Sequence, residues 1–201
     1  MLSCVRLGTQ AIQDNAADSG DDVPVHAAIL SVGGNLDDVV KAFAEAINAL
    51  QGHPQVSEVR NSSVWRTRPW GRKDQPDFLN MVLKLSTTMT PRSLLGFCQS
   101  LETAAGRVRR ARWGPRVLDI DIVSFDDLSV DSRFLTIPHP RAHERRFVLA
   151  PMSQIAPEQR LRGHTVEEWL ARLGPVQRQE DEAPEAAVDE DATIRLNALL
   201  Q

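Results

Sequence analysis

The sequence contains little cysteine and no long apolar stretch, and each shortage excludes a class of protein. Cys4 and Cys98 are its only cysteines, which excludes a disulfide-rich secreted domain and a four-thiolate zinc site. No segment approaches the roughly 18 consecutive apolar residues that a transmembrane helix requires. The first ten residues, MLSCVRLGTQ, lack the apolar core of a secretory signal. We therefore expect a cytoplasmic protein without a membrane partner.

Charge is nearly balanced over the whole chain but unevenly distributed along it. The sequence has 23 Lys and Arg against 27 Asp and Glu, a net charge of −4. Residues 180–191 hold seven acids and no base, whereas residues 60–116 hold twelve Lys or Arg and three acids. The basic stretch predicts contact with an anion. A solvated face and a nucleic-acid-binding surface are the alternatives at this point.

Composition divides the 201 residues into three segments. Residues 1–24 are small and polar and predict a disordered extension, residues 25–175 predict one globular domain, and residues 176–201 predict a poorly ordered acidic tail. Neither end has the composition to bury much apolar surface. We therefore expect that deleting residues 1–24 and 180–201 leaves stability and activity unchanged.

Apolar patterns within the domain alternate between strand and helix. Short apolar or alternating runs predict strands at residues 27–32, 56–65, 78–88 and 117–125. Apolar residues at helical spacing predict helices between residues 37 and 52 and between residues 90 and 105. This order predicts an α+β fold, a ferredoxin-like βαββαβ sandwich whose mostly antiparallel sheet carries helices packed on it. Because that fold hosts many unrelated activities, function must come from the site.

Two carboxylates in the segment 118–122, LDIDI, are the sharpest chemical feature. Residues two apart in a strand point to the same face, so Asp119 and Asp121 stand side by side. Their mutual repulsion is relieved by a cation, and Mg²⁺ takes one or two carboxylates together with phosphate oxygens and water. A solvent-facing strand edge with two isolated acids is the alternative.

The segment immediately before these carboxylates adds a second indication. Residues 107–116 contain five arginines, whose guanidinium groups pair with phosphate oxygens. A guanidinium cluster leading into a carboxylate pair is typical of polyphosphate transfer. Nearby, Trp70, Phe78 and Phe147 with the amide of Asn80 suit a flat, hydrogen-bonding heterocycle, with ordinary core packing as the alternative.

Together these motifs resemble the 6-hydroxymethyl-7,8-dihydropterin pyrophosphokinase family of folate biosynthesis. Residues 112–122, RWGPRVLDIDI, resemble the family block RWGPRxLDLDI, and residues 74–80, DQPDFLN, resemble DQPDYLN. Residues 138–147, PHPRAHERRF, resemble PHPRMHERxF. Residues 33–36, GGNL, and 66–70, RTRPW, resemble the first-strand turn and the pterin loop. The likeness covers residues 26–158, with the motifs in family order.

The resemblance implies transfer of the β,γ-pyrophosphoryl group of MgATP to the 6-hydroxymethyl oxygen of the pterin, with release of AMP. It implies two Mg²⁺ ions held by Asp119 and Asp121, with Asp121, Arg107 and Arg116 as catalytic residues. The ATP-binding residues that it implies are Gln99, Glu102, Arg109, Arg112, Trp113, Ile122, Thr136, His139 and Arg145. The pterin-binding residues that it implies are Thr67, Trp70, Phe78, Asn80 and Phe147. We expect a monomer whose partners are these small-molecule substrates and not nucleic acid.

Three positions depart from the family pattern. Phe134 stands where the family often has an arginine, and Phe78 replaces a common tyrosine. Gly34 replaces the usual serine of the first-strand turn, a change expected to matter little. Two other functions stay open: a nucleic-acid-binding module, which gives the paired aspartates no role, and a catalytically inactive partner subunit of another folate enzyme.

Overall fold

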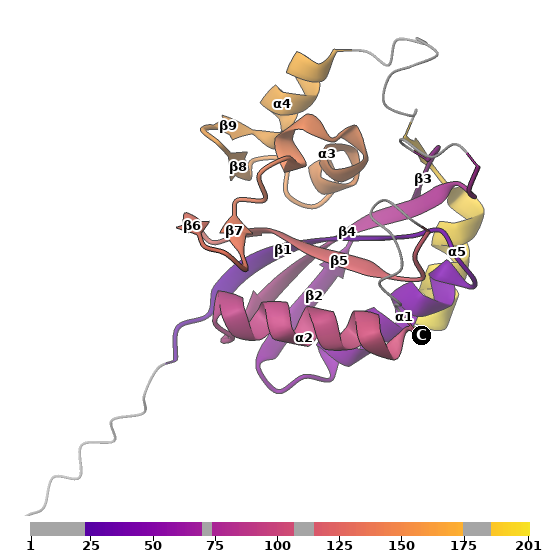
Figure 1. Cartoon of the computed structure of the whole chain (residues 1–201), viewed down its shortest axis with the longest axis horizontal. Helices are drawn as coiled ribbons and strands as arrows, with labels where there is room; N and C mark the ends of the chain where they lie inside the picture. The colour runs from indigo at the N-terminus through magenta and orange to yellow at the C-terminus, as the bar shows by residue number, and fades with distance from the viewer. Residues whose placement is uncertain (1–22, 70–73, 107–114, 175–185) are drawn as a thin grey trace, which may run out of the picture.

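The computed structural model describes residues 23–69, 74–106, 115–174 and 186–201, arranged as a sheet with helices on both faces (Figure 1). The strands are β1 (His26–Gly34), β2 (Val56–Asn61), β3 (Trp65–Thr67), β4 (Phe78–Thr87), β5 (Asp119–Phe125), β6 (Val130–Asp131), β7 (Thr136–Ile137), β8 (Arg160–Leu161), β9 (His164–Thr165) and β10 (Ala187–Val188). The helices are α1 (Val39–Gln51), α2 (Pro91–Ala104), α3 (Arg146–Ser153), α4 (Val166–Leu173) and α5 (Glu190–Leu199), with a 3₁₀ turn at Ala142–Glu144. None of these helices is long and apolar enough to cross a membrane.

The main sheet confirms the predicted α+β fold. Its strand order is β10-β3-β4-β1-β5, with β2 also paired to β4, and all of these pairs are antiparallel. The order β1-α1-β2-β4-α2-β5 is the predicted βαββαβ sequence of elements. The strand predicted at 56–65 is divided, because β2 and β3 follow one another along the same edge of β4 with residues 62–64 between them.

Each face of the sheet buries a separate apolar layer. On one face, Leu30 and Leu83 pack in one cluster with Phe43 of α1 and Leu94 of α2. On the other face, the neighbouring strand positions, such as Ile29, pack with residues of α3 and α4. This alternation follows from the two-residue period of a strand. The second face is the one on which the candidate site forms.

Helix starts agree with the capping residues in the sequence. The carboxylate of Asp38 accepts a hydrogen bond from Lys41 N at 3.1 Å at the start of α1. Thr90 caps α2 by accepting from Ser93 N at 3.2 Å, and Pro91 occupies the first turn. Side-chain acceptors at these positions satisfy backbone N–H groups that have no partner within the helix. The cap at Asp38 fixes where the turn after β1 ends.

The C-terminal residues correct one prediction. Residues 187–201, expected to belong to a poorly ordered tail, form β10 and α5, which lie beside β3 and α1 (Figure 1). Ala192 and Leu196 are buried in the same cluster as α1 because residues four apart share one helix face. Deleting 180–201 is therefore expected to lower stability, contrary to the prediction from composition. Residues 1–22 and 175–185 lie outside the described residues.

Candidate active site

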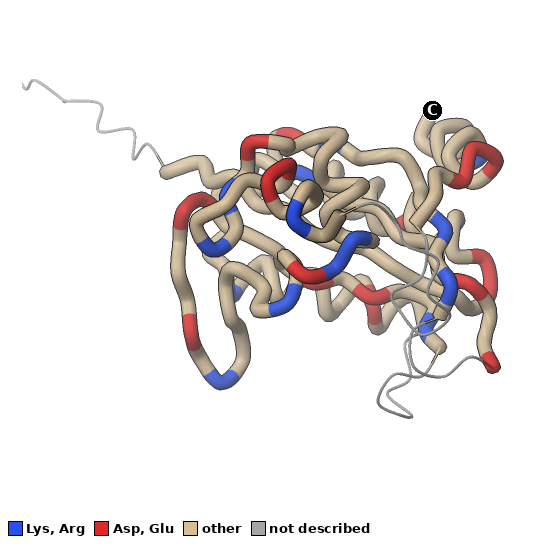
Figure 2. The backbone as a smooth tube through the Cα atoms, turned by 90° about the horizontal axis from the view of Figure 1, so that it is seen from above, with Lys and Arg blue, Asp and Glu red and all other residues tan. Residues whose placement is uncertain are grey.

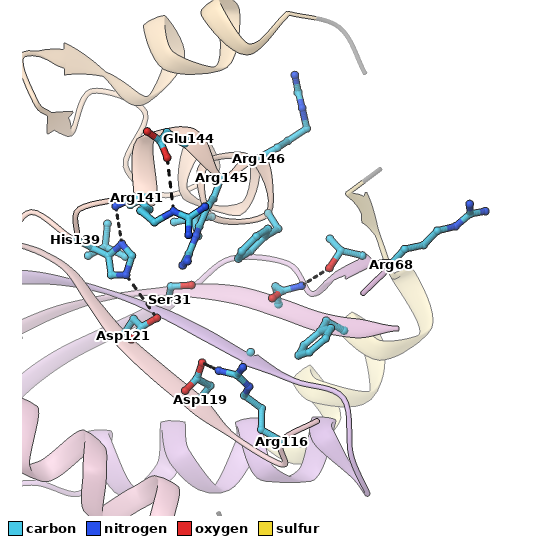
Figure 3. A pocket seen from close by; sticks show the side chains of 18 of the residues that line it. Ser31, Arg68, Arg116, Asp119, Asp121, His139, Arg141, Glu144, Arg145 and Arg146 are labelled. Carbon is cyan, nitrogen blue, oxygen red and sulfur yellow. Dashed lines mark hydrogen bonds and ion pairs between the residues drawn. The ribbon is translucent and has the colours of Figure 1, made fainter. Parts of the chain in front are cut away.

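A cavity of about 300 Å³ lies between the sheet and the segment that leads into α3 (Figure 3). Its walls come from β1, β3, β4 and β5 and from residues 139–148, and its volume is within the range of small-molecule sites. The predicted site residues that line it are Thr67, Phe78, Asn80, Arg116, Asp119, Asp121, His139, Arg145 and Phe147. The fold thus gathers in one cavity residues that come from four separate motifs.

The two aspartates enter the cavity from the start of β5. Asp119 lies opposite Gly33 in the strand register and Asp121 lies opposite Ser31. Both line the cavity, while Ile120 between them is buried in the core on the other face. The geometric part of the prediction, two carboxylates on one face, therefore holds.

Basic groups face these carboxylates. Arg116 Nη1 forms an ion pair with Asp119 Oδ2, and His139 Nε2 lies 3.9 Å from Asp121 Oδ2 (Figure 3). Arg145 points from the start of α3 toward the strands, and burial lowers its pKa while Asp121 opposes that shift. The cavity therefore brings the guanidinium groups of Arg116 and Arg145 together with two carboxylates, an arrangement suited to a metal-bound polyphosphate.

His139 is uncharged at neutral pH. Burial, followed by the neighbouring charges of Arg145 and Arg141, lowers its pKa from 6.5 to about 4. Its Nδ1 accepts a hydrogen bond from Arg141 N at 3.2 Å, so the ring proton is on Nε2, the nitrogen that faces Asp121. His139 therefore offers a neutral donor at the carboxylate end of the cavity.

The side chain of Asn35 holds together three segments, and two of its partners, Gln75 and Arg116, line the cavity. Its Oδ1 accepts from Arg116 N at 2.9 Å, and its Nδ2 donates to Gln75 Oε1 at 3.2 Å and Pro76 O at 3.1 Å. The backbone N–H of Asn35 also donates to Arg116 O at 2.9 Å. Asn35 is buried, so these bonds fix the turn after β1, the loop before β4 and the segment that carries Arg116.

The glycines of the same turn permit two close approaches. A Cβ on Gly34 would lie 2.3 Å from Val117 O, so the backbone after Arg116 contacts this turn directly. A Cβ on Gly33 would lie 3.0 Å from Asn80 Oδ1. Glycine at position 34, expected to be a minor departure, is therefore required by the packing of residue 117 in this chain.

A second part of the cavity, formed by Thr67, Phe78, Asn80 and Phe147, suits a flat heterocycle, and we call it the heterocycle-binding wall. Asn80 Nδ2 donates to Thr67 Oγ1 at 2.9 Å, and both side chains are buried. Phe78 enters from β4 of the sheet and Phe147 enters from α3, which packs on the sheet. The Arg145 guanidinium carbon lies 5.6 Å from the centroid of the Phe147 ring. Two aromatic rings with an amide and a hydroxyl suit a flat ligand that also forms hydrogen bonds.

Four predicted ATP-binding residues do not line the cavity. Gln99 is exposed on α2, whereas Glu102 is buried and its Oε1 accepts from Ile120 N at 2.8 Å. The side chain of Ile122 is buried in the core, and Thr136 belongs to β7. Their role in binding ATP stays a prediction. The predicted residues outside the described part of the chain are Trp70, Arg107, Arg109, Arg112 and Trp113.

Several cavity residues were missed from the sequence. Ser31 is the one polar residue in the run 27–32 and lies two residues before Gly33, a signal that the two-residue period could have revealed. Arg141 and Glu144 lie within the motif at 138–147 and form an ion pair at 3.7 Å. Three further charged or polar lining residues, Arg68, Gln75 and Arg146, also lie within quoted motifs, at 66–70, 74–80 and 138–147.

The arrangement fits Mg²⁺ better than a metal that needs a full set of protein ligands. Among the described residues, no group of three or more His, Cys, Asp and Glu could hold a metal ion. Asp119 and Asp121 alone are enough for Mg²⁺, since it keeps several waters and takes its other ligands from substrate phosphates. Figure 2 shows basic and acidic positions interspersed along the described backbone.

Residues 29–157 match the model of the 7,8-dihydro-6-hydroxymethylpterin-pyrophosphokinase (HPPK) family. The chain belongs to this family. It is 43% identical over 148 residues to the 2-amino-4-hydroxy-6-hydroxymethyldihydropteridine pyrophosphokinase of Methylorubrum extorquens, which covers 74% of this chain and 94% of that protein. It is 39% identical over 128 residues to the protein of the same name from Bacillus subtilis, covering 64% of this chain and 77% of that protein. The chain is therefore a pyrophosphokinase of folate biosynthesis, and the resemblance seen in its motifs is confirmed.

A solved structure supports the fold. The crystal structure of Plasmodium falciparum HPPK-DHPS, wild type with pterin and p-hydroxybenzoate, superposes with a TM-score of 0.59 at 14% identity. The match covers 76% of this chain and 44% of that chain, so this pyrophosphokinase spans less than half the length of that protein. The family match ends at residue 157 and leaves β10 and α5 outside it.

Proposed function

We propose that the cavity brings 6-hydroxymethyl-7,8-dihydropterin and ATP together and that a pyrophosphoryl group passes between them above Asp119 and Asp121. In this reaction the 6-hydroxymethyl oxygen bonds to the β-phosphorus of ATP, the bond between that phosphorus and the α-phosphate oxygen breaks, and the hydroxyl proton is lost. The products are the pterin diphosphate and AMP. One observation carries the proposal: the carboxylate pair, the cationic groups and the aromatic wall line the same cavity.

The pterin-binding part of the proposal rests on four residues. Phe78 and Phe147 cover the two faces of the ring, and Thr67 and Asn80 offer hydrogen bonds to its edge. Because Thr67 and Asn80 are buried, a ligand with matching donors and acceptors is favoured over one without them, since unmatched buried polar groups are costly. These four residues thus select the ring and orient its hydroxymethyl group.

The carboxylate end of the cavity is assigned to the phosphates. Asp119 and Asp121 are the residues that would hold Mg²⁺, which when bound neutralises charge on the phosphate oxygens. Arg116 and Arg145 bind and orient the polyphosphate, since guanidinium groups form paired hydrogen bonds with its oxygens. Neutral His139 donates from Nε2 at the same end and adds no charge that would compete for the carboxylates.

Product analysis tests this proposal. The unmodified protein is mixed with MgATP and 6-hydroxymethyl-7,8-dihydropterin, and the nucleotides are separated by ion-exchange chromatography. AMP is expected to appear in equal amount with the pterin diphosphate, and neither product is expected without the pterin. Formation of ADP, or no consumption of ATP, would contradict pyrophosphoryl transfer.

A further inference from the structure

The C-terminal segment β10–α5 lies outside the residues that match the family but is folded against the catalytic domain. Leu196 is completely buried and Ala192 is 8% exposed, both in the cluster that contains α1 and β1. Asp189 caps α5 by accepting from Ala192 N at 2.9 Å. This segment is therefore an element of the domain, and its contacts show which parts of the site it touches.

Its first contact is with β3 and the residue that precedes it. β10 pairs with β3 on the edge opposite β4, with Val188 opposite Trp65. Both backbone polar groups of the buried Val64 bond to the C-terminal segment: Val64 N donates to Thr193 Oγ1 at 2.9 Å, and Val64 O accepts from Asp189 N at 2.8 Å. Without these partners, β3 would be a three-residue edge strand paired only with β4.

Side chains strengthen the same contact. Arg66 Nε donates to Asp189 Oδ2 at 2.9 Å, and the Asp189 side chain is only 10% exposed. Farther along α5, Arg195 forms an ion pair with Asp38, the residue that caps α1 just after the Gly33–Gly34 turn. That bond lowers the pKa of Asp38 below 3.8. The segment thus joins β3 to the end of the turn that borders the cavity.

The contact between the C-terminal segment and β3 bears on function because β3 carries Thr67. Thr67 is the last residue of β3, and its hydroxyl accepts from the Asn80 amide inside the cavity. A shift of β3 away from β4 would separate Thr67 from Asn80 and remove one edge of the heterocycle-binding wall. Asp119 and Asp121 are on β5, at the opposite side of the sheet, and have no contact with β3 in the strand order.

We propose that the β10–α5 segment is a clamp that positions the heterocycle-binding wall, and with it the pterin, by holding β3 against β4. The proposal rests on the proposed function, because it assigns Thr67 and Asn80 to the pterin. Thr193 and Asp189 act through β3 and are positioning residues. The clamp sets affinity for the pterin and leaves ATP and the chemical step unaffected.

The decisive variant is Thr193→Val, which keeps the shape of the side chain and removes both the acceptor for Val64 N and the donor to Asp189 O. Thr193→Ser keeps the hydroxyl, and Ile194→Val alters the next residue, which is 67% exposed on the outer side of α5. Two readouts are taken well below the melting temperature: steady-state KM for each substrate, and hydrogen exchange of the amides of residues 64–67.

In Thr193→Val, which loses both hydrogen bonds of the Thr193 hydroxyl, the KM for the pterin is expected to rise roughly fivefold. The KM for ATP and kcat are expected to stay unchanged, the amides of residues 64–67 to exchange faster, and the amides of β1 to keep their protection. Thr193→Ser and Ile194→Val are expected to behave like the unmodified enzyme. A Thr193→Val enzyme that melts earlier but keeps its pterin KM would overturn the clamp. Absence of pterin turnover by the unmodified enzyme would instead refute the proposed function itself.

Discussion

Replacing Phe147 by alanine isolates one wall of the proposed pterin site. Phe147 lines the cavity from α3 and is partly buried against the cluster under that helix. A flat ring stacked on one face of a phenylalanine covers about 100 Å² of apolar surface, which at about 25 cal/mol per Å² is worth about 2.5 kcal/mol. Pterin affinity is therefore expected to fall between about tenfold and hundredfold.

ATP affinity is expected to change by less than about fivefold, since the Phe147 ring contributes to the ATP end only through its contact with Arg145, and such contacts are worth about 0.5–1 kcal/mol. Equilibrium titration with each substrate separates the two effects. Phe134→Ala is the matched control, because Phe134 is 70% exposed and does not line the cavity. Equal losses of pterin and ATP affinity in Phe147→Ala would show that the residue supports the fold and would refute the stacking role.

Two further predictions concern the interior of the protein. Leu196→Ala is expected to lower stability by about 2–5 kcal/mol and the melting temperature by about 5–15 °C. Leu199→Ala, on the same helix and 43% exposed, is expected to have little effect. Similar shifts in the two variants would show that α5 is not packed on the core. Burial raises the pKa of the Cys98 thiol to about 12, so in a Cys4→Ser background a thiol reagent at pH 8 is expected to label Cys98 only after unfolding, and rapid labelling of the native protein would contradict its burial. Because that pKa exceeds 9.0, the contribution of Cys98 to stability is present below pH 9 and is lost as the pH rises toward 12.

Much of the fold was predictable from local patterns. The alternation in LDIDI predicted that Asp119 and Asp121 share a face while Ile120 faces the core, and strand geometry alone is enough for that conclusion. Capping side chains predicted one helix start at Asp37 or Asp38 and another at Thr90, and the structure has the caps at Asp38 and Thr90. In each case the signal comes from residues within a few positions of one another.

The rest depends on contacts between distant segments. α5 buries only Ala192 and Leu196, and its other apolar residues, such as Ile194 and Leu199, are exposed. Its apolar residues therefore give too weak a helical period in the sequence to predict a helix. Asn35 was visible only as a turn residue, because its role is to join segments that meet only in the folded chain. Glu102, implied by the family to bind ATP, is buried and bonded to the backbone of β5, and this environment has no signature in the sequence.

The central claim is that Asp119 and Asp121 hold the Mg²⁺ on which pyrophosphoryl transfer depends. The most direct test is the rate of AMP formation by the Asp119→Ala, Asp121→Ala double variant as MgCl₂ is varied, compared with Asp127→Ala, which changes an exposed aspartate just beyond the same strand. The double variant is expected to lose about a thousandfold or more of the turnover, because metal binding and positioning carry this kind of transfer. It is expected to melt within a few degrees of the unmodified enzyme, since partly exposed ion pairs are worth at most about 1 kcal/mol. A double variant with full activity and the same Mg²⁺ dependence would contradict the assignment of the site.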